Sequence, residues 1–242
     1  MDNKEILFES GESNSEVVRV GDTVRRALTE RFDFVHRLMN ELKEKNFELS
    51  PTFLGVDKKN REIISYIPGT QMNKGEITLD LMKQSMKALR LFHDILAVSE
   101  LRGERETVIH TDFAPWNMIV DKGQLVGIID FDDAIPGERI KDIVYACWNL
   151  LDIGDLDSEY SEKNTLNLLP ELFDAYGDID RKCFVDELLN EQRRILKKRR
   201  KKMKQADNKE ERVERRNVCK EIRKQISWVS KHRGDLEKVL KN

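Results

Sequence analysis

Four side chains that could carry out phosphoryl transfer occur close together near the middle of this 242-residue chain. They are spaced at successive gaps of two, five and thirteen residues: His110, Asp112, Asn117 and Asp130. Transfer of a γ-phosphoryl group needs a carboxylate beside the acceptor hydroxyl and oxygen ligands for Mg²⁺, which fix the geometry of the phosphates. Asp112, Asn117 and Asp130 can supply these groups, so their order indicates kinase chemistry.

Short strands and turns are predicted to position these residues. The strands are expected at residues 108–109, 118–120 and 125–129, with turns at Ala114-Pro115 and Lys122-Gly123. Such a fold puts Asp112 and Asn117 on one loop and Asp130 at an adjacent strand end. Few protein oxygens are needed there, because Mg²⁺ completes its octahedron with phosphate and water oxygens.

The same run resembles the aminoglycoside phosphotransferase and choline kinase-like family, whose pattern is H-x-D-x-x-x-x-N followed by I-D-F or I-D-W. The resemblance implies that Asp112 is the catalytic base, that His110 supports the loop, and that Asn117 and Asp130 bind Mg²⁺. It extends over residues 17–150. The loop sequence F-A-P-W and the later Pro136-Gly137 resemble a bacterial branch with resistance and immunity members, such as trifolitoxin immunity-type proteins.

Several of these positions also have a purely structural interpretation. An isolated H-x-D is commonly only a capped turn, but four polar residues in register between apolar strands favour a site. We take His110 as a hydrogen-bonded scaffold residue rather than a proton carrier. Asp132 is assigned as a third metal or acceptor contact, and Asp133 is equally compatible with a solvated loop carboxylate.

The composition is that of a globular protein with long solvated helices, because 39% of residues are hydrophobic and 36% are charged. No run approaches the roughly 20 apolar residues of a membrane span, and the N-terminus has no apolar signal core. Cys147, Cys183 and Cys219 lack C-x-x-C spacing, which indicates free thiols in a reducing compartment. We therefore expect a cytoplasmic protein without a membrane partner; the sequence does not define its oligomeric state.

The charge is divided unevenly along the chain. From Glu191 onward there are 20 Lys or Arg against 8 Asp or Glu, whereas residues 1–190 have 23 against 37. An acidic body suits a cationic acceptor such as an aminoglycoside or an amine. Acidic surfaces are also widespread among soluble proteins, so both interpretations stay open.

A two-lobed, protein-kinase-like α+β fold follows from the resemblance and from the order of predicted elements. Residues 1–66 are expected to form a small β-rich nucleotide-binding lobe of five strands, residues 67–78 a linker, and residues 79–242 a helical lobe. Residues 10–15 form a polar loop that could curl over phosphates, but with a single glycine they also fit a plain hairpin turn.

The third predicted strand departs from the kinase pattern, because the usual phosphate-binding lysine is replaced by arginine. Period-two alternation puts Val24 and Arg26 on one face, so we choose Arg26 for the phosphates, with Arg25 second. A surface arginine pair is the alternative. The helix expected at residues 31–44 offers no clearly placed glutamate partner, and His36 is the candidate that it offers instead.

Ser65, Tyr66 and Ile67 resemble the hinge whose backbone groups hydrogen-bond adenine, although a strand that runs into a Pro-Gly turn has the same sequence. Helices are predicted at residues 78–98, 140–151, 166–176, 181–204 and 209–231. Acceptor contacts are expected among Asp132, Asp155, Asp157, Glu159 and Glu162. The basic run at residues 197–202 is interpreted as a solvated helix face, so a nucleic-acid partner is not expected.

The sequence thus predicts an ATP- or GTP-dependent, Mg²⁺-dependent phosphotransferase that acts on a hydroxyl of a small molecule. The acceptor could be an aminoglycoside-like compound or an amino alcohol, which would make this an antibiotic-resistance enzyme. The alternative is a non-catalytic immunity or binding protein of the same fold that sequesters a peptide or drug. The missing lysine supports the alternative, whereas the intact base and metal residues oppose it.

Overall fold

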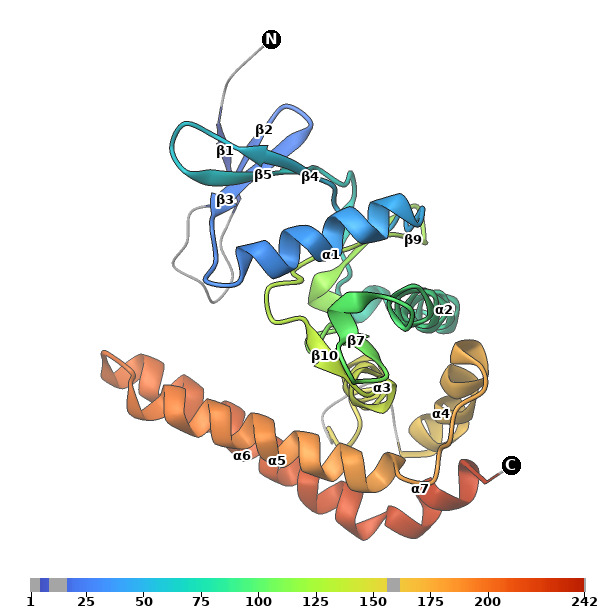
Figure 1. The fold of residues 1–242 in the computed structure, drawn as a ribbon. Coiled ribbons are helices and arrows are strands. Elements are labelled where there is room, and N and C mark those ends of the chain that lie inside the picture. Colours follow the sequence, from blue (N-terminus) through green and yellow to red (C-terminus); the bar gives the residue numbers. More distant parts are fainter. Residues whose placement is uncertain (1–4, 9–16, 156–161, 242) are drawn as a thin grey trace. The chain divides into compact units, whose positions relative to one another are not determined.

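The computed structural model describes residues 5–8, 17–155 and 162–241 (Figure 1). Contacts divide the chain into two compact units. The first comprises Met1–Ile77 and Arg90–Glu138, and the second comprises Thr78–Leu89 and Arg139–Asn242. All the predicted base, metal and hinge residues fall in the first unit. The predicted lobe limits at residues 66 and 79 stay a prediction.

A five-stranded antiparallel sheet forms the N-terminal part of the first unit, as predicted. Its strands follow the order β1-β2-β3-β5-β4. Their bounds are β1 (Ile6–Leu7), β2 (Val18–Val20), β3 (Thr23–Ala27), β4 (Phe53–Val56) and β5 (Arg61–Ser65). Because β3 is central and pairs with β5 along its whole length, residues of these two strands are the best fixed in the sheet.

Helix α1 (Phe32–Glu44) packs along this sheet (Figure 1). Its buried face contains an imidazole beside four apolar side chains: Val35, His36, Leu38, Met39 and Leu42. The helix ends at Glu44, and two residues later Asn46 has a φ of 58°, in the left-handed region that asparagine tolerates well. The next amide, of Phe47, then donates to the Leu42 carbonyl at 2.8 Å, which turns the chain toward β4.

Two smaller sheets complete the first unit. One contains β6 (Thr70–Gln71), β8 (Met118–Asp121) and β9 (Gln124–Ile128), and the other pairs β7 (Thr107–Ile109) with β10 (Ile135–Gly137). Strands β8 and β9 form the predicted hairpin. Lys122 and Gly123 have φ values of 50° and 76°, the positive values that a tight two-residue turn needs. Short 3₁₀ helices lie at Lys74–Glu76, Glu100–Arg102 and Pro115–Asn117.

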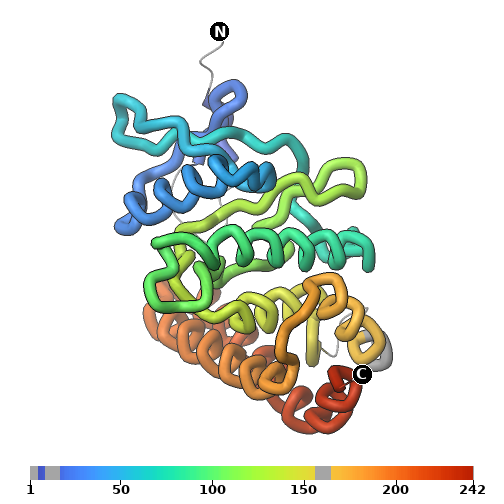
Figure 2. Tube along the Cα trace, turned by 45° about the vertical axis from the view of Figure 1, so that its right-hand side comes forward, coloured from blue at the N-terminus to red at the C-terminus, as the bar shows by residue number. Residues whose placement is uncertain are grey.

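Helix α2 (Leu79–Leu96) crosses the limit between the units, and the remaining helices belong to the second unit. They are α3 (Arg139–Leu150), α4 (Glu162–Tyr176), α5 (Phe184–Lys204), α6 (Lys209–Lys231) and α7 (Arg233–Val239). The longest two, α5 and α6, lie antiparallel and side by side (Figures 1 and 2). The rings of Phe173 and Phe184, on α4 and α5, meet edge to face at 5.3 Å. Among the described residues, no helix combines the length and apolar character required to cross a membrane.

Gly69 allows the chain after β5 to approach β8 very closely. A Cβ at this position would lie 2.6 Å from the backbone oxygen of Val120, and the φ of +141° is one that other residues rarely adopt. The segment that follows the predicted hinge is therefore packed closely against the β8–β9 hairpin, which is flanked by the predicted metal ligands Asn117 and Asp130.

Gly69→Ala should lower the free energy of unfolding by about 1–3 kcal/mol, because the methyl group meets backbone rather than a flexible side chain. Gly75→Ala is the matched control, since a Cβ there has nothing within 4 Å; its effect should stay within about 0.5 kcal/mol. Urea unfolding followed by circular dichroism measures both. Equal effects of the two variants would contradict this account of Gly69.

Candidate phosphoryl-transfer site

Three hydrogen bonds join the loop that follows β7 to the chain that follows β9. His110 Nε2 lies 3.0 Å from the Ile129 carbonyl, and the Ile129 amide donates to the Asn117 carbonyl at 2.9 Å. Thr111 Oγ1 donates to the Asp133 carbonyl at 3.2 Å. These bonds hold the loop that carries Asp112 and the strand end that carries Asp130 in fixed register.

Asp112 is oriented by two side chains of its own loop. Asn117 Nδ2 donates both to the Asp112 carboxylate and to its backbone oxygen, each at 2.9 Å, and Trp116 Nε1 donates to the same carboxylate oxygen at 3.2 Å. The Asn117 amide group thereby directs its nitrogen at Asp112, so its carbonyl oxygen is the atom left for a metal ion. Trp116, 40% exposed, is a neighbour of the candidate base that the sequence did not single out.

His110 has the surroundings of a scaffold residue. A carbonyl oxygen only accepts hydrogen bonds, so His110 Nε2 must be protonated and donate its hydrogen bond to the Ile129 carbonyl. The buried ring lies 5.0 Å from the ring of Phe131 and meets that of Phe113 edge to face at 5.9 Å. This packing favours the predicted role in support of the loop.

Asp130 is a half-exposed carboxylate on a strained backbone. Its φ is 66° and its side chain is 50% exposed. Desolvation by the surrounding protein, together with the negative charge of Asp132, raises the pKa of Asp130 above its ordinary value, against the opposing charge of Arg26. A bound cation would therefore stabilise the ionised form of Asp130. Hard oxygen donors from Asp130 and Asn117 fit Mg²⁺.

Arg26 is the arginine that lies with these residues. Its Nη1 and Nη2 donate to the two carboxylate oxygens of Asp132 at 3.0 and 2.6 Å, and Asp130 lies 3.8 Å away. Burial works against the charge, but the carboxylates outweigh it and raise the pKa of Arg26. Arg25, on the opposite face of β3, instead contacts Thr23 and lies 4.0 Å from Asp57. The geometry thus favours the choice of Arg26.

Asp132 was predicted as a metal contact, and the structure pairs it with Arg26. Its bidentate contact and its lower exposure, 27% against 50% for Asp130, make Asp130 the more accessible of the two for a metal ion. Asp132 would have to release Arg26 before it could bind Mg²⁺.

Glu62 is the functional candidate that sequence reasoning missed. Arg26 Nε donates to Glu62 Oε1, directly across the β3–β5 pair, and His36 Nε2 contacts Glu62 Oε2 at 2.9 Å. Because a carboxylate only accepts, this imidazole nitrogen carries a proton. One signal was present in the sequence: Glu62 alternates with the apolar Ile64, which places a charged side chain on a buried strand face.

The predicted hinge begins where β5 ends. The Ser65 amide donates to the Thr52 carbonyl and the Tyr66 amide to the Asp22 carbonyl, each at 2.9 Å. Among the described residues, no turn or loop hydrogen bond joins the Ile67 amide to a backbone carbonyl. Of the three predicted hinge residues, Ile67 therefore has the N–H best placed to serve a ligand.

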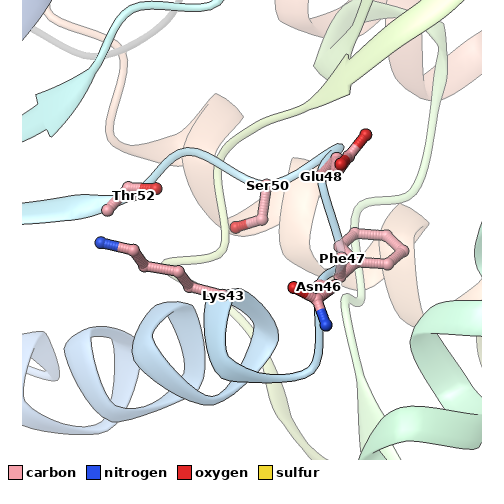
Figure 3. A pocket seen from close by; sticks show the side chains of 6 residues that line it. All are labelled: Lys43, Asn46, Phe47, Glu48, Ser50 and Thr52. Atoms are coloured by element: carbon pink, nitrogen blue, oxygen red, sulfur yellow. The ribbon is translucent and has the colours of Figure 1, made fainter.

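A surface pocket of about 330 Å³ lies elsewhere in the first unit, at the end of α1 (Figure 3). Six residues line it: Lys43, Asn46, Phe47, Glu48, Ser50 and Thr52. None of the predicted site residues lines this pocket. Across the described ranges, no group of three His, Cys, Asp or Glu side chains is arranged to hold a metal ion.

Some predicted positions lie outside the site as described. The polar loop at residues 10–15, Asp157 and Glu159 fall outside the described residues. Asp155 is half-buried in the second unit, and Glu162 begins α4 in the same unit. These acceptor contacts therefore stay predictions.

Comparison with known proteins identifies the class to which this fold and site correspond. The sequence profile of the Phosphotransferase enzyme family matches residues 96–183, which include the whole segment from His110 to Asp133. The α+β arrangement of a small antiparallel sheet followed by helices is the two-lobed fold of the protein-kinase-like phosphotransferases. Both the predicted fold class and the predicted resemblance are confirmed.

Three particular proteins illustrate the similarity. The trifolitoxin immunity protein of Rhizobium leguminosarum bv. trifolii is 29% identical over 213 residues, which cover 77% of this chain and 80% of that protein. A choline/ethanolamine kinase family protein from Mesorhizobium loti has a TM-score of 0.58 at 16% identity, with 94% of this chain and 93% of that chain covered. Spectinomycin phosphotransferase, solved with ADP and spectinomycin, has a TM-score of 0.60 at 12% identity, with 96% and 93% covered.

The two neighbouring carboxylates should affect stability in opposite directions when metal is absent. In EDTA at neutral pH, Asp130→Asn should raise Tm, because a raised pKa means that the ionised form destabilises the folded state. As the pH falls through that pKa, the wild-type carboxyl is protonated and the difference should vanish. Asp132→Asn should lower stability by about 1–3 kcal/mol, since the buried Arg26 loses a charged partner. Thermal melts at several pH values measure both effects. A lower Tm of Asp130→Asn at neutral pH would contradict the claim that the ionised Asp130 carboxylate destabilises the metal-free folded state.

Proposed function

We propose that this protein transfers the γ-phosphoryl group of ATP or GTP to a hydroxyl of a small molecule. The observation that carries the proposal is the arrangement of Asp112, Asn117 and Asp130 on two hydrogen-bonded segments, within the range that matches the Phosphotransferase enzyme family. Simple binding gives no reason for a carboxylate base next to a pair of hard oxygen donors.

Asp112 would accept the proton of the acceptor hydroxyl as its oxygen attacks the γ-phosphorus. The bond between that phosphorus and the bridging oxygen to the β-phosphate breaks, and the nucleoside diphosphate leaves. The hydrogen bonds from Asn117 and Trp116 hold the carboxylate in one orientation, which lets the hydroxyl approach without a search among rotamers.

The nucleotide would be held at three points in the first unit. Asn117 and Asp130 supply oxygens for Mg²⁺, which when bound neutralises charge on the phosphates. Arg26 supplies a guanidinium for the phosphates, and the Ile67 N–H supplies a donor for the base, beside Ser65 and Tyr66. Residues 1–66, the predicted nucleotide lobe, include Arg26.

The acceptor class is inferred from charge. The excess of acidic residues before residue 191 favours a cationic compound, either an aminoglycoside-like molecule or an amino alcohol. Spectinomycin phosphotransferase, of the same fold, has a small-molecule acceptor of its own. Phosphorylation of an aminoglycoside-like antibiotic would confer resistance to it, in a protein that we expect to be cytoplasmic.

A second candidate function is favoured by the similarity to the trifolitoxin immunity protein. A kinase-like fold without the usual lysine could sequester a toxic peptide or drug and not turn it over. The two candidates differ in whether Mg²⁺-nucleotide binds.

Nucleotide should raise Tm only when Mg²⁺ is present, because ligand that binds the folded state stabilises it by mass action. A thermal-shift screen with ATP and GTP, each with Mg²⁺ and with EDTA, tests this. Asp130→Ala should abolish the Mg²⁺-dependent part of the shift. Equal Tm shifts with Mg²⁺ and with EDTA would contradict the proposed metal site. No shift at all would favour the sequestration candidate.

Asp112→Asn keeps the size of the side chain and removes the charge that receives the proton. We expect kcat to fall about a hundred- to ten-thousand-fold, while nucleotide affinity changes only a few-fold. Phosphorylation of aminoglycosides, amino alcohols and sugars, followed by mass spectrometry, finds the acceptor and then measures the variant. Wild-type turnover by Asp112→Asn would show that another group is the base.

A further inference from the structure

Two buried polar side chains of the first unit have no task in the proposed reaction. Glu62 is 2% exposed and contacts Arg26, and His36 is 8% exposed and contacts Glu62. We infer that Glu62, held by His36, is a positioning residue that presents Arg26 to the phosphates of the nucleotide. The inference rests on the proposed nucleotide binding and assigns a glutamate of strand β5 as the partner of Arg26.

The guanidinium of Arg26 binds two carboxylates through different edges of its planar group. Its Nε donates to Glu62, whereas its Nη1 and Nη2 both donate to Asp132. Glu62 thus holds the side of the planar group and leaves the two-pronged end for another anion. Phosphate binds arginine at this end in the same bidentate way as a carboxylate.

Glu62 can serve as a fixed anchor because its backbone and its side chain are both constrained. Its backbone is paired in register with that of Arg26 in the centre of the sheet. Each carboxylate oxygen receives one donor, Arg26 at Oε1 and His36 at Oε2. Rotation of the Glu62 side chain would break both hydrogen bonds at once. Because this carboxylate is buried from water, loss of its hydrogen-bond donors would cost much free energy.

His36 is itself held in one orientation by aromatic rings. Its imidazole stacks on Phe53 with ring centroids 3.6 Å apart and planes 18° apart, and Phe32 meets it edge-on at 5.6 Å. The ring therefore presents Nε2 to Glu62 and has little freedom to turn. Helix α1 is thus linked to Arg26 through His36 and then Glu62. Two residues together hold the guanidinium in place.

Asp132 acts in this arrangement as a stand-in for phosphate. It is the more exposed of the two carboxylates, with 27% of its side chain accessible against 3% for Glu62. When nucleotide binds, phosphate replaces Asp132 at the Nη1 and Nη2 end, and Glu62 remains in place. Removal of the competing carboxylate should then favour nucleotide.

The first test is a double-mutant cycle on Mg²⁺-ATP and Mg²⁺-GTP affinity, measured by calorimetry well below Tm. Glu62→Gln and Arg26→Gln should each weaken binding about tenfold or more, and the double variant should bind no more weakly than Arg26→Gln alone. The matched control is Asp57→Asn, which breaks the ion pair with Arg61 in the same sheet and should leave affinity unchanged. Wild-type affinity of Glu62→Gln, or additive losses, would overturn the inference while the proposed function stands. Failure of the wild-type protein to bind either nucleotide would overturn both.

Two further variants keep the test decisive if Glu62→Gln does not fold. His36→Gln retains a donor for Glu62 and should bind Mg²⁺-ATP within about twofold of wild type, whereas His36→Leu should lose several-fold. Equal affinities of these two variants would count against the bracing role. With Mg²⁺ present, Asp132→Asn should bind ATP more tightly than wild type although it is less stable, and weaker binding would refute the exchange of Asp132 for phosphate.

Discussion

A guanidinium that is largely removed from water must be neutralised where it lies, and in this protein the charge of Arg26 determines what surrounds it. Glu62 and Asp132 bind it from two sides, and His36 fixes Glu62 in turn. These contacts join β3, β5, α1 and the chain after β9. The N-terminal sheet and the segment that carries Asp130 and Asp132 are thereby connected through one cation.

The loop with Asp112 is constrained in a different way, by backbone hydrogen bonds rather than by charge. Its bonds to Ile129 and Asp133 hold it against the end of β9, and both Thr111 and Asp130 have positive φ. For a β-branched residue such as Thr111 this conformation is strained, and strain of this kind is retained where surrounding contacts fix it. The loop is thus held in this conformation by contacts within the protein, at a cost in local stability.

Much of this could be predicted from the sequence because it depends on local pattern. Alternation placed Val24 and Arg26 on one face, and the Lys122-Gly123 turn fixed the hairpin that positions Asn117. Glu62 was missed because its role depends on which strands are neighbours. The order β3-β5-β4 puts β5 beside β3, and no local pattern states that order. The sequence pattern offered a partner for Arg26 only on the helix, whereas the partner lies directly across the sheet.

The presence of arginine in place of lysine also affects how such a protein can be detected. Nucleotide analogues that carry a reactive acyl group on the terminal phosphate label kinases by transfer of that group to a nearby amine. Arg26 has no free amine, and the carboxylates around it raise its pKa further above the usual value, so it remains a charged and poor nucleophile at any physiological pH. Methods that find kinases through an acylated lysine would therefore not label this chain at that position.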